Sequence, residues 1–175
     1  MTKSFDRVAA SCRVAALLAG FALAGTAAYA QDLTAQVMDA ASEPRGTVTV
    51  SPLLTGGSLI VLDLTGLPPG THGVHLHETG SCEGPEFTSA GAHIAGGHEH
   101  GVMGQGGAHP GDLPNLHVPE NGALKVEYFA PAVTADLLMD GDGSAIVIHA
   151  DPDDYTTPPT GNSGARIACG VFAGE

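Results

Sequence analysis

Histidine is concentrated in one stretch of the chain, from Gly70 to Asp112. Of the nine histidines in the 175-residue sequence, seven lie in this stretch, together with many glycines. Imidazole nitrogens bind copper, zinc, iron and nickel, and glycine allows a loop to wrap closely around an ion. A segment of this composition has no obvious core of its own. We therefore expect it to bind metal against a scaffold that other segments build.

The first candidate ligands lie in the segment Gly73–Glu78, where imidazole and aliphatic side chains alternate. Successive side chains of a β-strand point to opposite faces, so His75 and His77 would share one face. The aliphatic face can then pack into a core while the other face presents two imidazoles to one metal. His149, which ends another apolar segment, is a candidate third ligand.

A second set of candidate ligands follows in the glycine-rich segment: His93, His100, His109 and Asp112. Three imidazoles and one carboxylate make a tetrahedral zinc site without an open position, as structural zinc sites have. The spacing alone leaves a second interpretation open, namely a flexible histidine-rich tract that binds metal loosely.

The rest of the sequence consists of short apolar or alternating segments separated by glycine, proline and aspartate. This pattern predicts strands over residues 33–40, 46–51, 58–64, 73–78, 123–129, 144–150 and 166–172. No segment shows a helical period, so the predicted fold class is all-β, a sandwich or a barrel. Two connections, one that extends to about residue 115 and one over residues 151–164, are unusually long. Ordered loops of such length are usually functional.

The first 30 residues have the composition of a signal peptide. Basic residues precede an apolar run from Val14 to Ala28, and Ala28-Tyr29-Ala30 has the small-x-small form of a cleavage site. We therefore predict cleavage after Ala30, export across one membrane, and a single mature domain over residues 31–175. The alternative is an uncleaved membrane anchor, for which the apolar run is short.

The chain is acidic, with a formal net charge of −13 at pH 7. Once the leader is removed, Arg45, Lys125 and Arg166 are the only lysine and arginine residues left. An acidic surface keeps a protein soluble and repels nucleic acid and anionic lipid. We therefore expect neither nucleic acid nor a membrane as a partner of the mature domain.

Two cysteines belong to the mature domain, Cys82 and Cys169. An even pair in an exported protein indicates a disulfide. Loop-entropy models predict that a disulfide across a loop of this length contributes roughly 4–5 kcal/mol to the free energy of unfolding. The alternative is two free buried thiols.

Several motifs make the chain similar to the bacterial exported copper/zinc superoxide dismutases. They are Gly-Val-His-Leu-His-Glu at 73–78, Ser-Cys-Glu at 81–83, Ser-Ala-Gly-Ala-His-Ile at 89–94, His-Gly at 100–101, His-Pro-Gly-Asp-Leu-Pro-Asn at 109–115, Ile-His-Ala at 148–150 and Gly-Asn-Ser-Gly-Ala-Arg-Ile-Ala-Cys-Gly-Val at 161–171. They occur in the family's order and span nearly all of the mature domain.

The resemblance implies a flattened eight-stranded Greek-key β-barrel, an immunoglobulin-like sandwich with a metal-binding loop and an electrostatic loop. It implies an enzyme that converts two superoxide anions and two protons into dioxygen and hydrogen peroxide, with one copper and one zinc per subunit. We therefore expect a small anion as the substrate and the periplasm as the compartment. A homodimer is one possible assembly, and no subunit contact can be read from the sequence.

The resemblance also implies a role for each matching residue. The copper ligands are His75, His77, His93 and His149, and the zinc ligands are His93, His100, His109 and Asp112. His93 would bridge the metals and carry a proton in catalysis, and Arg166 would bind the anion beside copper. Supporting roles fall to Asp153, which would link a copper ligand to a zinc ligand, to His72, and to a disulfide between Cys82 and Cys169.

The sequence departs from the family pattern near the bridging residue. Ala92 and Ala95-Gly96 replace the family's usual residues, and His98 could compete with His100 for zinc. We favour His100 because His-Gly follows the family pattern there, and we interpret His117 as a surface histidine. Three alternatives to the enzyme are a copper/zinc carrier on the same fold, a copper-only variant and a purely structural β-domain.

The second long loop is acidic, with three aspartates and no lysine before Arg166. Superoxide dismutases are themselves a standard example of enzymes that steer a charged substrate electrostatically. For this chain we expect steering that is modest or focused locally on the metals and Arg166.

Overall fold

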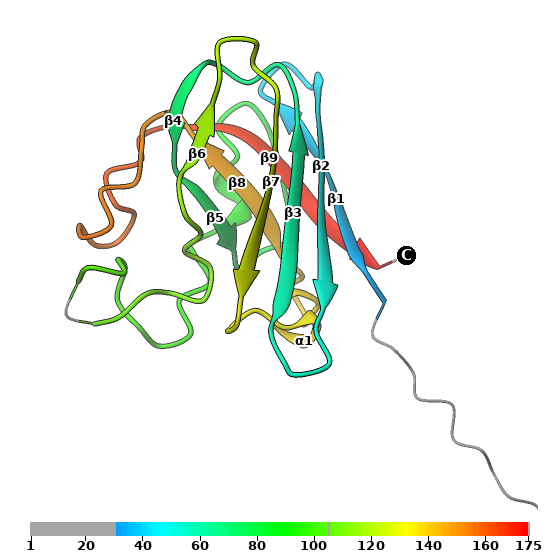
Figure 1. The fold of residues 1–175 in the computed structure, drawn as a ribbon, viewed down its shortest axis with the longest axis vertical. Coiled ribbons are helices and arrows are strands. Elements are labelled where there is room, and N and C mark those ends of the chain that lie inside the picture. The colour runs from blue at the N-terminus through cyan, green and yellow to red at the C-terminus, as the bar shows by residue number, and fades with distance from the viewer. Residues whose placement is uncertain (1–30, 105, 175) are drawn as a thin grey trace, which may run out of the picture.

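A computed structural model describes residues 31–104 and 106–174, which form an antiparallel β-structure (Figure 1). Seven strands make one sheet in the order β5-β8-β9-β1-β2-β3-β7, and β4 and β6 make a two-stranded sheet. The strands are β1 (Leu33–Asp39), β2 (Pro44–Pro52), β3 (Ser58–Leu64), β4 (Gly70–His72), β5 (Val74–His77), β6 (Leu116–Val118), β7 (Leu124–Ala130), β8 (Ala145–His149) and β9 (Arg166–Gly174). The predicted all-β class is confirmed.

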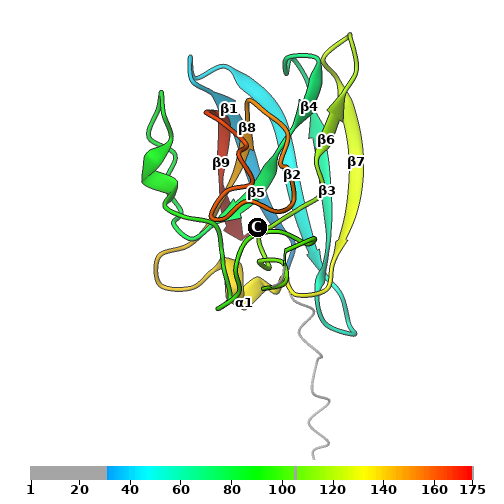
Figure 2. The ribbon, with the colours of Figure 1, turned by 90° about the vertical axis from the view of Figure 1, so that its left-hand side faces the viewer.

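The seven-stranded sheet is curled (Figure 2), and alternate side chains of its strands form the hydrophobic core. Side chains alternate between the core and solvent along strand β3. Ile60, Leu62 and Leu64 are fully buried, whereas Asp63 is exposed and pairs with Lys125 of β7 at 3.1 Å. Each aliphatic side chain that is fully buried contributes about 1.5–3 kcal/mol relative to an exposed one. The larger fully buried members of the core include Ile60, Leu62, Leu64, Leu76, Leu116, Leu138, Ile146 and Ile148.

Strands β4 and β5 are one extended segment interrupted at Gly73. Before this residue the chain pairs with β6, and after it the chain pairs with β8. Counted as one strand, the segment gives the eight strands that were predicted. A β-carbon on Gly73 would lie 2.6 Å from the Ser163 hydroxyl oxygen, so the backbone can approach the second loop here only with glycine.

The seven strands predicted from the sequence pattern are all present, with β3 matching its predicted bounds. The pattern did not predict β6 or the helix α1 (Ala135–Leu138), which Thr134 caps by accepting a hydrogen bond from the Leu137 N–H. A three-residue strand and a one-turn helix are too short for a period to be recognised.

Both long loops lie on the same side of the molecule, next to β5 and β8 (Figures 1 and 2). They are joined by hydrogen bonds from the Met103 N–H to the Tyr155 carbonyl oxygen (3.1 Å) and from the Asn115 N–H to the Tyr155 hydroxyl oxygen (2.8 Å). The first loop also covers the free edge of β5, because the Leu76 backbone bonds to Gly111 and Ile94. The loops are therefore held to each other and to β5 by hydrogen bonds from backbone N–H groups.

The predicted signal peptide lies outside the described residues. Across the part of the chain that the structure does describe, no helix has both the length and the apolar character needed to cross a membrane.

Candidate metal centre

Four histidines from three segments meet beside β5 and β8. His75 and His77 come from β5, His149 ends β8, and His93 belongs to the first loop and forms an isolated bridge with His77. One ligand nitrogen from each lies within 4.8 Å of those of the other three. The four residues are between 0% and 4% exposed. The structure thus brings together the residues that the resemblance assigns to copper.

Each of these four imidazoles has one buried nitrogen without a hydrogen-bond partner, and these atoms are His75 Nδ1, His77 Nε2, His93 Nε2 and His149 Nε2. In all four the other nitrogen lies against an acceptor, and in three of them this acceptor is not a proposed metal ligand. The pairs are His75 Nε2 with Asp153 Oδ2 (2.8 Å), His77 Nδ1 with the Gly91 carbonyl oxygen (3.0 Å) and His149 Nδ1 with the Gly164 carbonyl oxygen (3.4 Å). Donating a proton there leaves a lone pair on the unpartnered nitrogen, which is the form that binds metal.

A second group surrounds the carboxylate of Asp112. The Nδ1 atoms of His93, His100 and His109 lie 3.1, 3.0 and 3.2 Å from its oxygens, and the four ligand atoms are all within 4.8 Å of one another. His100 Nδ1 lacks the geometry of a hydrogen bond to Asp112 despite the short distance, and it has no other partner. A short distance without a hydrogen bond, as between His100 Nδ1 and Asp112, fits two ligands that face one cation.

His93 belongs to both groups. Its Nδ1 faces Asp112, while its Nε2 faces the other copper-site histidines and has no partner. The ring stacks on His75 with centroids 4.0 Å apart, and both residues are almost completely buried. A single imidazole is therefore placed so that each nitrogen meets a different ligand set.

Asp153 joins the two groups from behind. One of its carboxylate oxygens accepts from His75 Nε2 at 2.8 Å, and the other accepts from His100 Nε2 at 3.0 Å. The backbone of Asp153 is fixed in turn by the Asn115 side chain, which accepts from its N–H and donates to its carbonyl oxygen, both at 2.9 Å. The sequence analysis assigned Asn115 no role. A single asparagine outside any periodic segment does not reveal from the sequence that its side chain is buried or which backbone groups it contacts.

Burial keeps the imidazoles of His77, His149 and His93 neutral at physiological pH. It lowers the pKa of His77 to about 2, that of His149 to about 3 and that of His93 to about 4, with neighbouring imidazoles lowering the pKa of each further. For Asp112, burial alone would raise the pKa, but the hydrogen bond from His93 and the adjacent histidines outweigh it and lower the pKa. Neutral imidazoles and an ionised carboxylate are the forms that metals bind.

The other histidines of the stretch fall outside both ligand sets. His98 is exposed and its Nδ1 is 3.4 Å from the Gly106 carbonyl oxygen, whereas His100 is buried in the second group. His72 is buried, with its ring nitrogens 2.8 Å from the His149 carbonyl oxygen and 2.9 Å from that of Pro68. His117, outside the stretch, is exposed as expected.

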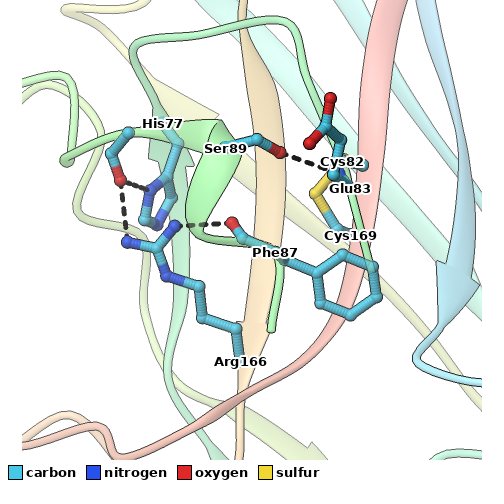
Figure 3. Close-up of a disulfide and its surroundings, with 8 residues drawn as sticks. His77, Cys82, Glu83, Phe87, Ser89, Arg166 and Cys169 are labelled. Carbon is cyan, nitrogen blue, oxygen red and sulfur yellow. Dashed lines mark hydrogen bonds between the residues drawn. A yellow bond between two sulfur atoms is a disulfide. The ribbon is translucent and has the colours of Figure 1, made fainter. Parts of the chain in front are cut away.

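Arg166 opens β9, and its guanidinium group is held by two carbonyl oxygens of the first loop (Figure 3). Nη1 donates to Phe87 and Nη2 donates to Gly91, both at 2.7 Å. The Gly91 oxygen also lies against His77 Nδ1, so one atom connects the arginine with a histidine of the copper set. These acceptors are backbone atoms, which a sequence cannot reveal as partners.

The disulfide between Cys82 and Cys169 ties this part of the loop to β9 (Figure 3). The Cα atoms are 5.7 Å apart across a separation of 87 residues, so the predicted pairing is confirmed. The disulfide thereby joins the loop that accepts the Arg166 hydrogen bonds to the strand that carries Arg166.

The two groups fit the two metals that the resemblance implies. The first offers four imidazole nitrogens, a donor set that suits copper. The second offers three imidazoles and one carboxylate, the closed tetrahedral set of a structural zinc site. The unpartnered buried nitrogens are the observation that decides the fit, because polar atoms buried without partners are rare in native proteins.

Comparisons with known proteins agree with this geometry. The family model for copper/zinc superoxide dismutase matches residues 44–172. A copper–zinc superoxide dismutase of Caulobacter vibrioides is 43% identical over 147 residues, which cover 79% of this chain and 84% of the relative.

Two solved structures are also similar. The Cu/Zn superoxide dismutase from Brucella abortus has a TM-score of 0.68 and 30% identity, and the match covers 82% of this chain and 100% of that one. A SOD-like protein from Bacillus subtilis has a TM-score of 0.76 and 37% identity, with coverage of 80% and 97%. With its curled antiparallel sheet and its paired histidine and aspartate clusters, the chain belongs to the copper/zinc superoxide dismutase family.

Proposed function

We propose that copper is bound by His75, His77, His93 and His149, and zinc by His93, His100, His109 and Asp112. The observation that carries this assignment is that His93 belongs to both clusters, with one nitrogen toward each. The activity is that of the family: two superoxide anions and two protons become dioxygen and hydrogen peroxide.

Copper, when bound, supplies the one-electron redox cycle that oxidises one superoxide and reduces the next. The protein's part is positioning and proton handling. His93 can hold a proton at Nε2, because its Nδ1 is turned toward the Asp112 set and that side of the ring is fixed. Arg166 supplies a positive charge and hydrogen-bond donors for a small anion, and its two loop contacts keep the guanidinium group beside His77.

Asp153 is proposed to orient His75 and His100 together, so that both sets keep their geometry when one ligand moves. His72 supports the copper strand through its contact with the His149 carbonyl oxygen. Neither residue needs to contact the substrate for these roles.

The assignment is tested by measuring copper and zinc per chain and superoxide removal for residues 31–175 and for His75→Ala, with His117→Ala as the control. We expect one copper and one zinc per wild-type chain. His75→Ala should lose most of its copper and its activity, while His117→Ala keeps both. A fully metal-loaded but inactive wild type would favour a metal carrier, and an active chain that binds no zinc would favour a copper-only enzyme.

We also propose that residues 1–30 are a signal peptide that is removed after Ala30, which places residues 31–175 in the periplasm. The small-x-small sequence at residues 28–30 and the acidic mature domain support this. N-terminal sequencing of the protein purified from periplasmic extract should start at Gln31. A start at Met1 in the membrane fraction would contradict export by cleavage.

A further inference from the structure

A hollow of about 400 Å³ opens beside Arg166. It lies between the disulfide-linked loop and the second long loop, and its lining residues are Pro85, Glu86, Thr88, Gly164, Ala165 and Arg166. Three of these residues, Pro85, Glu86 and Thr88, are exposed residues of the first loop, and Arg166 is half-buried. The hollow is therefore open to solvent and bordered by Arg166.

Arg166, which borders the hollow, is connected to the proposed copper site. The guanidinium group of Arg166 donates to the Phe87 and Gly91 carbonyl oxygens, and His77 Nδ1 lies 3.0 Å from the same Gly91 oxygen. An anion that reaches Arg166 through the hollow is therefore next to a copper-site histidine. Gly91 O is the atom that both side chains share.

The charges on the rim of the hollow oppose an anion. Arg166 is the one basic residue that lines it, and Glu86, which is exposed, is the one acidic residue. Asp151 adds a second carboxylate close by, because its Oδ2 occupies the space that a β-carbon on Gly164 would need. The other two cations of the described chain are paired elsewhere, Arg45 with Asp39 and Lys125 with Asp63.

We propose that Glu86 limits the rate at which superoxide is captured, by placing a negative charge at the entrance to Arg166. Glu86 is a residue that sets the rate without contacting the reacting atoms. The proposal rests on the assignment of Arg166 as the group that binds the anion. On this proposal, the carboxylate of Glu86 and the guanidinium group of Arg166 act on the approaching anion in opposite directions, and both act over a short range.

The size of the effect follows from Coulomb's law in water. A unit charge on the order of 10 Å from the entering anion changes its local concentration about twofold at low ionic strength. Replacing the negative charge with a positive one doubles the change in charge, so the local concentration of the anion should rise about fourfold. The effect should vanish at about 1 M salt, where the screening length falls to roughly 3 Å.

The test compares kcat/KM for superoxide in fully metal-loaded wild type, Glu86→Gln and Glu86→Lys at ionic strengths of about 0.01 M and about 1 M. The matched control is Glu83→Gln, which removes the same charge from the same loop. Glu83 lies beside the disulfide, apart from the Arg166 guanidinium group (Figure 3), and does not line the hollow. Metal content and the thermal midpoint are measured for every variant.

At low salt we expect about a twofold rise for Glu86→Gln and about a fourfold rise for Glu86→Lys, with both ratios near one at high salt. Glu83→Gln should stay close to wild type at both salt concentrations. The proposal is overturned if Glu86→Gln is unchanged or slower at low salt, or if Glu83→Gln rises equally, since the effect would then reflect net charge alone.

An Arg166→Gln variant separates this proposal from the one on which it rests. If Arg166→Gln keeps the wild-type rate, the assignment of the anion-binding group fails and the role of Glu86 fails with it. If Arg166→Gln is slower by about tenfold or more, as expected for losing charged hydrogen bonds, while Glu86→Gln is unchanged, only the role of Glu86 is wrong.

Discussion

Asp153 accepts hydrogen bonds from two metal-site histidines at once, and this double contact makes it the side chain on which both clusters depend. Its two oxygens are 2.8 Å from His75 Nε2 and 3.0 Å from His100 Nε2. The carboxylate is buried, yet its hydrogen bonds with His75 and His100 outweigh the effect of burial and lower its pKa. An ionised acceptor fixes both rings in the tautomer that leaves the metal-facing nitrogens free.

Asp153→Asn should therefore weaken both metal sites. An amide can accept at one position only, so one ring loses its partner or meets an N–H group instead. We expect affinities for copper and zinc to fall by about 10- to 100-fold, measured by competition with chelators. Asp154→Asn is the control, because Asp154 is exposed and its carboxylate accepts from Thr156, Thr157 and Asn162, none of which is a proposed metal ligand. Equal losses in both variants would show that loop order, and not the double contact, matters.

At the scale of elements, the centre is built where β5 and β8 meet the two loops. The alternation within Gly73–Glu78 was enough to predict that His75 and His77 share a strand face, because period two is a property of extended backbone. Residue types and spacing in the first loop gave His93, His100, His109 and Asp112 as a candidate zinc set but left a loose histidine-rich tract as the alternative. The family resemblance favoured the zinc set and supplied the bridging role of His93. The carbonyl oxygens that hold Arg166 and the pairing of β4 with β6 could not be predicted, since they depend on backbone positions that only the folded chain defines.

Gly161 provides a test of how tightly the second loop is packed on the centre. Its φ is 61°, and a β-carbon there would overlap Asp153 Oδ1 and lie 2.6 Å from His100 Nε2. Gly161→Ala should cost about 1–3 kcal/mol from backbone conformation alone, and the overlap should also displace the Asp153–His100 contact. We expect a lower thermal midpoint and reduced zinc retention.

Gly141→Ala is the matched control for that change. A β-carbon on Gly141 would meet nothing within 4 Å, and this glycine has no positive φ. Its thermal midpoint should stay close to that of wild type. If Gly161→Ala behaves like Gly141→Ala, the second loop has room that the structure does not indicate.

At the scale of the whole molecule, the buried imidazoles link stability to pH when metal is removed. The pKa values of His77, His93 and His149 are about 2, 4 and 3 in the folded chain, below the ordinary value of 6.5. At a pH between the folded value and the ordinary value, each of these histidines is protonated in the unfolded chain and neutral in the folded chain. The stability of the metal-free protein should therefore be complete above about pH 6.5 and fall as the pH drops toward 4, by up to about 1.4 kcal/mol per pH unit for each histidine.

Urea unfolding of the metal-free protein between about pH 7.5 and 4.5 measures this slope. His149→Gln removes one of the three groups, so its slope should be lower by about a third. A free energy of unfolding that does not change across this range would mean that the imidazoles are solvated, in contradiction to their burial.

The central claim is that His93 joins two metals, and anomalous diffraction from crystals of the metal-loaded protein tests it most directly. Data collected at the copper and zinc absorption edges locate each element separately. We predict one copper peak among His75 Nδ1, His77 Nε2, His93 Nε2 and His149 Nε2, and one zinc peak about 2.0–2.1 Å from the Nδ1 atoms of His93, His100 and His109. A map in which the His93 ring contacts a single metal, or in which both peaks hold the same element, would contradict the account.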